Sequence, residues 1–214
     1  FEQPIANDIV RFGSTYFRND LKNLIQDVVT SGDLFTPVNV GVASTFGTEN
    51  FAAWQVSKDL NLRADYTYTV AKDDITGQQL LRRPKNKASL TANWLATDRL
   101  LITSTLLYVG PWWDFARQAE PPDGISPLIK APGFTTLNLA ANYALRDDVT
   151  LFARIDNLFN KQYEDPAGFL RPGFGIFGGL RFTAGGTPSS GLPNTIPAAN
   201  TTPVAPSPRS QGIM

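Results

Sequence analysis

The most constraining feature of this sequence is an alternation of apolar and polar residues with a period of two. Successive side chains of a β-strand point to opposite faces, so the alternation predicts strands with one apolar and one polar face. It is clearest at residues 61–71, 89–94, 136–145, 149–155 and 174–182, and the runs 8–18, 38–56 and 100–110 are also strand-like. The sequence therefore predicts an all-β chain of about eight strands, without a helix.

The connections between these strands alternate strictly between short and long. The short polar connections are residues 57–59, 97–99 and 146–148, and the long ones are roughly 19–37, 73–85, 115–133 and 160–173. Bacterial outer-membrane barrels have short turns at one end and long loops at the other, whereas a β-sandwich has no reason to keep its short turns together. The predicted fold is an antiparallel up-and-down meander of transmembrane strands.

Aromatic residues recur at one height in this predicted meander. Trp54, Trp94 and Tyr143 each lie on an apolar face, three residues before the end of a strand at a short turn. Aromatic rings at a constant height are typical of the girdle at a membrane interface. We therefore expect the apolar face to meet lipid and the polar face to meet a watery lumen. Five charged residues are expected on the lumen side, namely Arg63, Asp65, Arg154, Asp156 and Arg181, where they pair with one another, with a plug inside the barrel, or with a passing solute.

Composition excludes several function classes. The chain has no cysteine and no histidine, so it cannot form a disulfide, a thiolate or imidazole metal site, or a Ser-His catalytic pair. No catalytic constellation appears among its carboxylates, and we expect neither enzymatic activity nor a cofactor. Nineteen basic and nineteen acidic residues give zero net charge, which argues against a nucleic-acid partner. The sequence has no run of about 18 consecutive apolar residues, so it predicts no transmembrane helix.

The end of the chain changes character. Residues 183–214 hold 6 of the 16 prolines and a single charged residue, Arg209. Such a segment buries too little apolar surface to offset the entropy lost on ordering. We therefore expect two regions, a strand-forming part over residues 1–182 and a disordered tail rich in Pro, Ser and Thr over residues 183–214.

One block of sequence resembles a known family. Ile155-Asp156-Asn157-Leu158-Phe159-Asn160-Lys161-Gln162-Tyr163-Glu164, followed by Arg171-Pro172-Gly173 and Gly179-Leu180-Arg181-Phe182, is similar to the last strands of a TonB-dependent outer-membrane receptor. The resemblance covers residues 1–182. It implies a segment of a barrel of about 22 strands, with a plug and the TonB-contacting segment ahead of Phe1, and makes Phe182 the terminal aromatic. Phe174 stands where the family usually has arginine, and the tail beyond Phe182 is unusual.

The resemblance also implies a function. Such a receptor, in the bacterial outer membrane, takes up a large scarce ligand such as a ferric siderophore or cobalamin, driven by the TonB complex and surrounded by lipid and lipopolysaccharide. Two alternatives stay open from the residues alone. One is a complete eight-stranded barrel with a structural or adhesion role, and the other is a soluble β-sandwich that binds sugar.

Two groups of residues are candidates for ligand binding. Trp112, Trp113 and Asp114 lie at the mouth of the third long connection, where two indoles offer broad apolar contact; membrane-interface anchoring is the alternative explanation. Arg82 and Arg83 lie in the second long connection and suit an anionic ligand or a lipopolysaccharide phosphate. The alternative for this pair is an ordinary solvated loop.

Overall fold

The computed structural model describes residues 1–5, 9–30, 33–116 and 127–183. In these residues the regular structure is entirely β, and no helix is long and apolar enough to cross a membrane. The strands are β1 (Glu2–Ile5), β2 (Val10–Thr30), β3 (Asp33–Ser57), β4 (Leu60–Asp73), β5 (Asn86–Thr97), β6 (Leu100–Val109), β7 (Trp112–Phe115), β8 (Leu128–Ala131), β9 (Phe134–Arg146), β10 (Val149–Asp156) and β11 (Gly175–Phe182).

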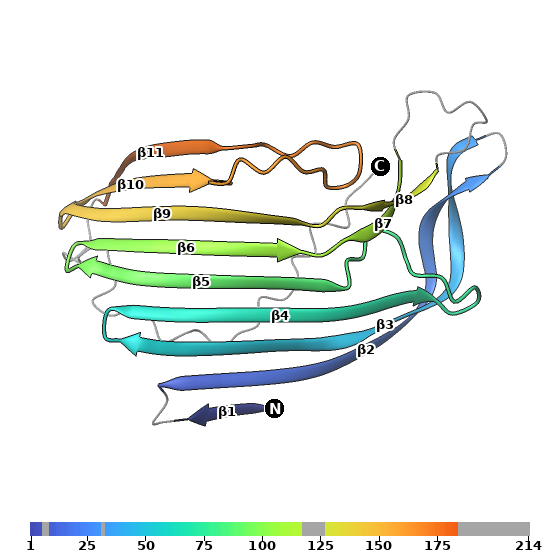
Figure 1. Cartoon of the computed structure of the whole chain (residues 1–214), viewed down its shortest axis with the longest axis horizontal. Coiled ribbons are helices and arrows are strands. Elements are labelled where there is room, and N and C mark those ends of the chain that lie inside the picture. The colour runs from blue at the N-terminus through green and yellow to red at the C-terminus, as the bar shows by residue number, and fades with distance from the viewer. Residues whose placement is uncertain (6–8, 31–32, 117–126, 184–214) are drawn as a thin grey trace.

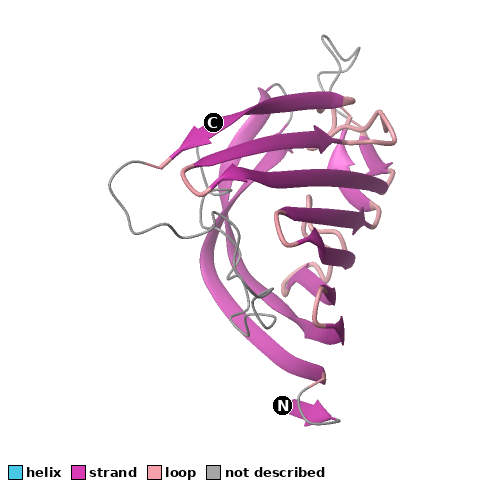
Figure 2. Cartoon of the chain, turned by 90° about the vertical axis from the view of Figure 1, so that its left-hand side faces the viewer, coloured by secondary structure: helices cyan, strands magenta, loops and turns pink. Residues whose placement is uncertain are grey.

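Nine of these strands form one antiparallel sheet in the order β1-β2-β3-β4-β5-β6-β9-β10-β11 (Figure 1). Strands β7 and β8 form a separate hairpin that interrupts the chain between β6 and β9. Figure 2 shows that the large sheet is curved rather than flat. The predicted antiparallel meander is therefore confirmed: the eight predicted strands are β2–β6 and β9–β11, and β1 adds a short strand at one edge.

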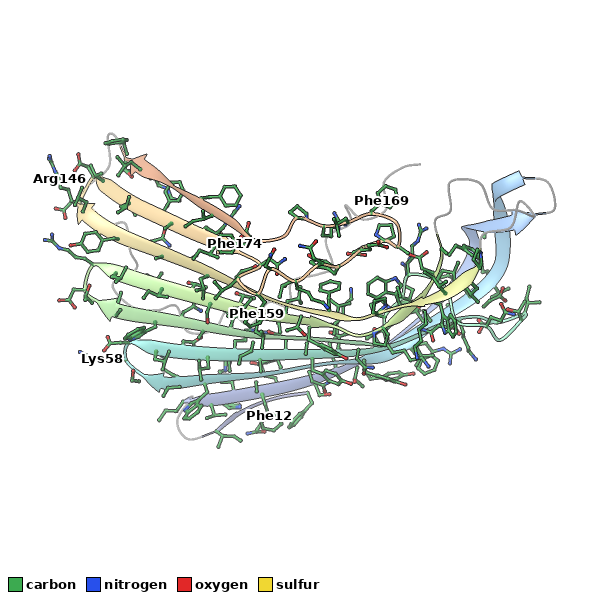
Figure 3. All side chains as sticks on the ribbon, turned by 45° about the horizontal axis from the view of Figure 1, so that its top comes forward. Phe12, Lys58, Arg146, Phe159, Phe169 and Phe174 are labelled. Carbon is green, nitrogen blue, oxygen red and sulfur yellow. The ribbon has the colours of Figure 1, made fainter. Side chains whose placement is uncertain are left out.

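The three predicted short polar turns lie at one end of the sheet. They connect β3 to β4, β5 to β6 and β9 to β10, each through two residues. Lys58 and Arg146, from two of these turns, lie at the same end of the sheet in Figure 3. The longer connections, residues 74–85, 110–133 and 157–174, therefore lie at the other end.

The prediction of a long loop over residues 19–37 is wrong. Backbone pairing between β2 and β3 continues to the pair Thr30 and Asp33, with a register shift between Val28 and Thr30 and a positive φ of 59° at Asn23. Residues 24–40 contain four valines and one isoleucine, which favour extended backbone even where polar residues interrupt the alternation. The predicted loop over residues 115–133 likewise contains β8 and the end of β7.

The topology contradicts both alternatives to a barrel segment. Within the described residues, β1 pairs only with β2 and β11 only with β10, so the sheet is open and is not a closed eight-stranded barrel. It is also one sheet with a small hairpin, whereas a β-sandwich packs two sheets face to face. The predicted tail lies outside the described residues except for Thr183, whose amide donates to the Asp148 carbonyl at 3.0 Å.

Buried apolar side chains form two small clusters rather than one central core. The first cluster contains Val109, Trp112, Ala131 and Phe134, and the second contains Ala43, Ala71 and Leu80. Both lie toward the end of the sheet that carries the long connections. Large apolar side chains along the strands stay exposed, among them Trp54, Leu90, Trp94, Tyr143 and Leu180. Exposed apolar surface of this extent indicates a partner surface or lipid.

Candidate functional site

The long connections meet at one buried carboxylate. Asp114, on β7, is 0% exposed. Its Oδ1 accepts hydrogen bonds from Nε of Arg82 and from the amide of Phe115, both at 2.9 Å, and its Oδ2 accepts one from the amide of Ala167 at 3.0 Å. A buried charge is tolerated when it is paired and hydrogen-bonded in this way. Asp114 thus joins the 74–85 connection, the β7–β8 hairpin and the 157–174 connection.

The alternation along β7 explains this arrangement. Trp112 and Asp114 point to the buried side of the hairpin, while Trp113 between them is 38% exposed. The ring of Trp112 meets Phe134 edge to face at 6.2 Å, and Phe134 stacks on Tyr163 with centroids 3.9 Å apart. Tyr163 belongs to the 157–174 connection, so aromatic packing joins it to the β6–β9 region beside the Asp114 carboxylate.

Three of the five predicted ligand residues are exposed and belong to segments that Asp114 joins. Arg82 is half exposed, and its amide donates to the carbonyl of Trp113 at 2.8 Å. Arg83 is exposed and donates from Nη1 to the carbonyl of Arg82 at 3.2 Å. We call Arg82, Arg83 and Trp113 the loop surface. Trp112 and Asp114, the other two predicted ligand residues, are buried and do not belong to it.

The five charged residues expected on the lumen side share one face of the sheet. The cross-strand register places Arg63, Asp65, Arg154, Asp156 and Arg181 on the face opposite to Leu62 and Leu151. Four of them form ion pairs along a strand: Arg63 pairs with Asp65 at 2.7 Å, and Arg154 with Asp156 at 3.0 Å. These two ion pairs agree with the prediction that the charged residues of this face pair with one another.

Arginine also lies over phenylalanine on this face. The guanidinium of Arg63 is 4.7 Å from the ring centre of Phe51, and that of Arg181 is 6.0 Å from the ring centre of Phe152. Each ring in turn covers a glycine of the neighbouring strand: a Cβ at Gly13 would lie 2.3 Å from the Phe51 ring, and one at Gly179 would lie 2.8 Å from the Phe152 ring. Cross-strand aromatic cover of glycine stabilises a sheet, and the arginine adds a cation–π contact.

The four aromatic residues predicted for the membrane interface share the other face. Trp54 lies opposite Leu62, and Leu60, two residues away, lies opposite Trp94. On the same face, Tyr143 lies opposite Leu100 on β6 and opposite Leu151 on β10. Leu151 in turn lies opposite Leu180, and Phe182, two residues further along β11, points to the same face. All four rings are exposed, between 38% for Tyr143 and 71% for Phe182.

Two asparagines that sequence reasoning did not single out organise the 157–174 connection. Asn157 is buried with a φ of 50°; its side chain donates to the carbonyl of Lys161 and accepts from the amide of Lys161, both at 2.9 Å. Oδ1 of Asn160 accepts the amide of Phe174 at 2.9 Å, and the φ of Asn160 is 48°. Asparagine tolerates this left-handed backbone, and its side chain readily hydrogen-bonds to nearby main chain. The spacing of the two asparagines in Asn157-Leu-Phe-Asn160 was therefore the sequence signal for this turn.

Residues 5–158 match the family model described as "TonB dependent receptor-like, beta-barrel". The iron-regulated outer membrane virulence protein of Vibrio cholerae is 29% identical over 164 residues, which cover 69% of this chain and 24% of that protein. The vitamin B12 transporter BtuB of Photobacterium profundum is 32% identical over 136 residues, covering 62% of this chain and 20% of that protein. The chain thus spans about a quarter of the length of these relatives.

The same fold occurs in a solved structure. The ferripyoverdine receptor of the outer membrane of Pseudomonas aeruginosa, bound to ferripyoverdine, superimposes with a TM-score of 0.65 over 85% of this chain and 26% of that one. The sequence identity is 16%, so this likeness concerns the fold alone.

Proposed function

The chain belongs to the β-barrel family of TonB-dependent receptors, and we propose that it supplies wall strands and outer loops to a receptor for active uptake of a large scarce ligand, such as a ferric siderophore or cobalamin. It is an outer-membrane protein, as are its relatives. The relatives include an iron-regulated protein and a vitamin B12 transporter, which supports iron complexes and cobalamin as the ligand classes to test.

One observation carries the proposal to particular residues. Asp114 fastens three separate segments at the end of the sheet away from the short turns, and two of them carry the exposed side chains of Arg82, Arg83 and Trp113. A preformed surface avoids part of the entropy lost when loops order around a ligand. Two guanidinium groups and an exposed indole at this end of the sheet suit a large ligand that has anionic and apolar parts.

The two faces of the sheet have separate proposed partners. Trp54, Trp94, Tyr143 and Phe182 face lipid, because their exposed rings share the face that carries most of the large exposed apolar side chains. The opposite face, with the Arg63–Asp65 and Arg154–Asp156 pairs, lines the lumen. The TonB complex is the proposed energy source, and lipopolysaccharide is a second proposed partner of Arg82 and Arg83.

Uptake by intact cells tests this function. The gene for the full-length receptor that contains this segment would be deleted and restored, and uptake of radiolabelled ferric siderophores and radiolabelled cobalamin would be measured with and without TonB. We expect saturable uptake of one of these ligands that requires both the receptor and TonB. Equal uptake of every ligand in the deleted and restored strains would refute the proposal.

A further inference from the structure

The face that we assign to the lumen continues to the end of the sheet that carries the long connections. Lys87, at the start of β5, lies opposite Val109 on β6, and Val109 lies opposite Phe134 on β9. Ser89, two residues further along β5, lies opposite Asp65, which places Lys87 on the face of Asp65. Lys87 and Phe134 therefore share the lumen face, with their backbones about 10 Å apart across two strand spacings.

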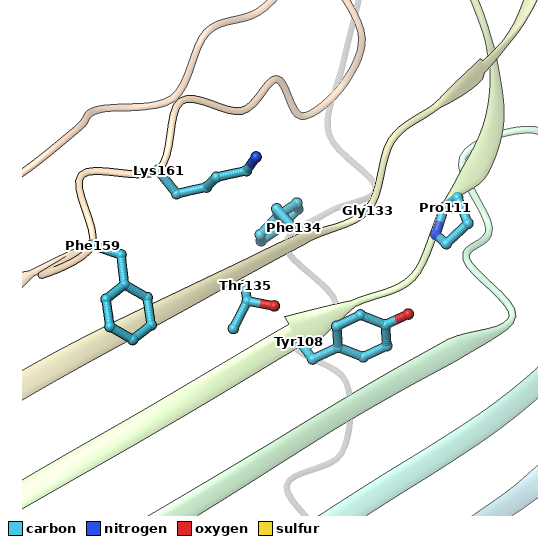
Figure 4. Close-up of a pocket in the computed structure, with 7 residues that line it drawn as sticks. All are labelled: Tyr108, Pro111, Gly133, Phe134, Thr135, Phe159 and Lys161. Atoms are coloured by element: carbon cyan, nitrogen blue, oxygen red, sulfur yellow. The ribbon is translucent and has the colours of Figure 1, made fainter.

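A second lysine lies over the same part of this face. In Figure 4 the side chain of Lys161 extends over the ring of Phe134. Asn157 holds both the amide and the carbonyl of Lys161, and the amide of Leu158 donates to the carbonyl of Leu137 on β9 at 2.7 Å. The turn that carries Lys161 is therefore fastened to the sheet, and its place beside Phe134 does not depend on a bound molecule.

The part of the face between the two lysines is apolar. Val109, which lies between Lys87 and Phe134 in the register, is buried in one cluster with Phe134. Tyr163 stacks on Phe134 with ring centres 3.9 Å apart. Near a protein surface of low dielectric constant, a charge acts more strongly on a bound ion than it does in bulk water. Lys87 and Lys161 therefore border a partly aromatic surface on which their charges are effective.

Neither lysine has an acidic partner among the residues that the structure describes. Both are exposed, and neither forms a salt bridge within those ranges. Asp65 is already paired with Arg63 at 2.7 Å, and Glu49 lies two strands away from Lys87. The described carboxylates of the long connections also have other partners, namely Ser44 for Asp74, Arg82 for Asp114, the amide of Gly168 for Glu164, and Arg171 for Asp165.

We propose that Lys87 and Lys161 bind the anionic part of the transported ligand, and that they select an anionic iron chelate over uncharged ligands. This inference rests on the proposed function, and it adds a contact on the inner face to the loop surface. An iron chelate built from catecholate rings combines negative charge for the two lysines with aromatic groups for Phe134 and Tyr163. Complementary charges of this kind also disfavour ligands that lack the charge.

Equilibrium binding to the purified full-length receptor tests this selection. Isothermal titration calorimetry in a neutral detergent would compare a synthetic trianionic ferric tris-catecholate, an uncharged ferric tris-hydroxamate and cyanocobalamin, which is uncharged overall. We expect the tris-catecholate to bind most tightly. Lys87→Gln and Lys161→Gln should each weaken its binding about fivefold, which corresponds to about 1 kcal/mol, because unit charges about 4 Å apart in water interact with about this energy.

Lys58→Gln is the matched control, since it removes the same charge from an exposed residue at the short-turn end. It should leave all affinities unchanged, and Lys87→Gln and Lys161→Gln should leave binding of the tris-hydroxamate unchanged. Tighter binding of either uncharged probe, failure of the tris-catecholate to bind, or equal effects of the three substitutions would overturn the inference. A receptor that takes up cobalamin would satisfy the uptake proposal and refute this one, so the two proposals fail separately.

Discussion

The carboxylate of Asp114 accepts a hydrogen bond from the backbone amide of Ala167, 53 residues further along the chain, at a distance of 3.0 Å. The same carboxylate binds Nε of Arg82, 32 residues earlier in the chain. Two long connections and one hairpin therefore share a single polar anchor, and a movement of one requires a break in the hydrogen bonds of the others. This coupling makes Asp114 the residue whose loss should affect the largest part of the loop end.

Asp114→Asn should loosen the connections on both sides of the hairpin. The amide keeps the shape of the carboxylate but loses the charge that faces Arg82 and one of the two acceptor oxygens. A hydrogen bond to a charged group contributes about 1.5–3 kcal/mol, so local opening should become roughly tenfold to a hundredfold more frequent. Hydrogen exchange of the full-length receptor would show this as faster exchange in residues 74–85 and 157–174.

Asp165→Asn is the matched control for that measurement. Asp165 lies in the same connection as Ala167, but its carboxylate is half exposed and 3.8 Å from Arg171. Exposed ion pairs contribute about 0–1 kcal/mol, so exchange should barely change. If the two variants loosened the loops equally, Asp114 would not be the anchor.

Much of this fold was predictable from the sequence because strand facing is a local property. A period of two sets which side chains share a face, and the cross-strand register bears this out from Trp54 to Trp94. The short turns after Ser57 and Thr97 were also predictable, because a few polar residues between two alternating runs indicate a tight turn between two strands. The extension of β2 and β3 was missed because backbone pairing continues where side-chain alternation does not.

The anchor was not predictable, because its burial depends on distant segments. Asp114 follows two tryptophans in a region that reads as a loop, where an aspartate is ordinarily solvated. Asp114 becomes buried because Arg82 and Ala167, which are distant in the sequence, contact it in the folded chain. Trp112 was likewise predicted to lie at the surface, but it packs in a buried cluster with Phe134, on which Tyr163 stacks. The sequence therefore pointed to all five residues but did not predict that Trp112 and Asp114 are buried.

Gly179→Val should destabilise the edge of the sheet through Phe152. The Phe152 ring lies where the new side chain must go, 2.8 Å from the position of a Cβ, and it also lies beneath Arg181. Overpacking of this kind costs about 1–3 kcal/mol, to be measured by urea unfolding of the full-length receptor. In a Phe152→Ala background the same change should cost clearly less. An identical cost in both backgrounds would show that the ring is not the obstacle.

Arginine substitutions on neighbouring residues of β5 test the assignment of the two faces. Leu90 lies between Ala64 and Leu106 on the face assigned to lipid, whereas Ser89 lies directly opposite Asp65 on the other face. Arginine on the lipid face near the bilayer midplane costs about 2–4 kcal/mol, so Leu90→Arg should reduce the yield of assembled receptor in the outer membrane. Ser89→Arg should assemble normally, since Asp65 faces the new charge. A normal yield for Leu90→Arg with a loss for Ser89→Arg would reverse the facing.

The central claim is that the surface held by Asp114 contacts the transported ligand, and the dissociation constant of the full-length receptor tests it most directly. The comparison is between the natural sequence and a variant with both Arg83→Gln and Trp113→Ala, two exposed residues that are not hydrogen-bond partners of the Asp114 carboxylate. Loss of an exposed aromatic contact and a cation should weaken binding at least about tenfold, with an unchanged melting temperature. A dissociation constant that stayed the same in this variant would contradict the claim.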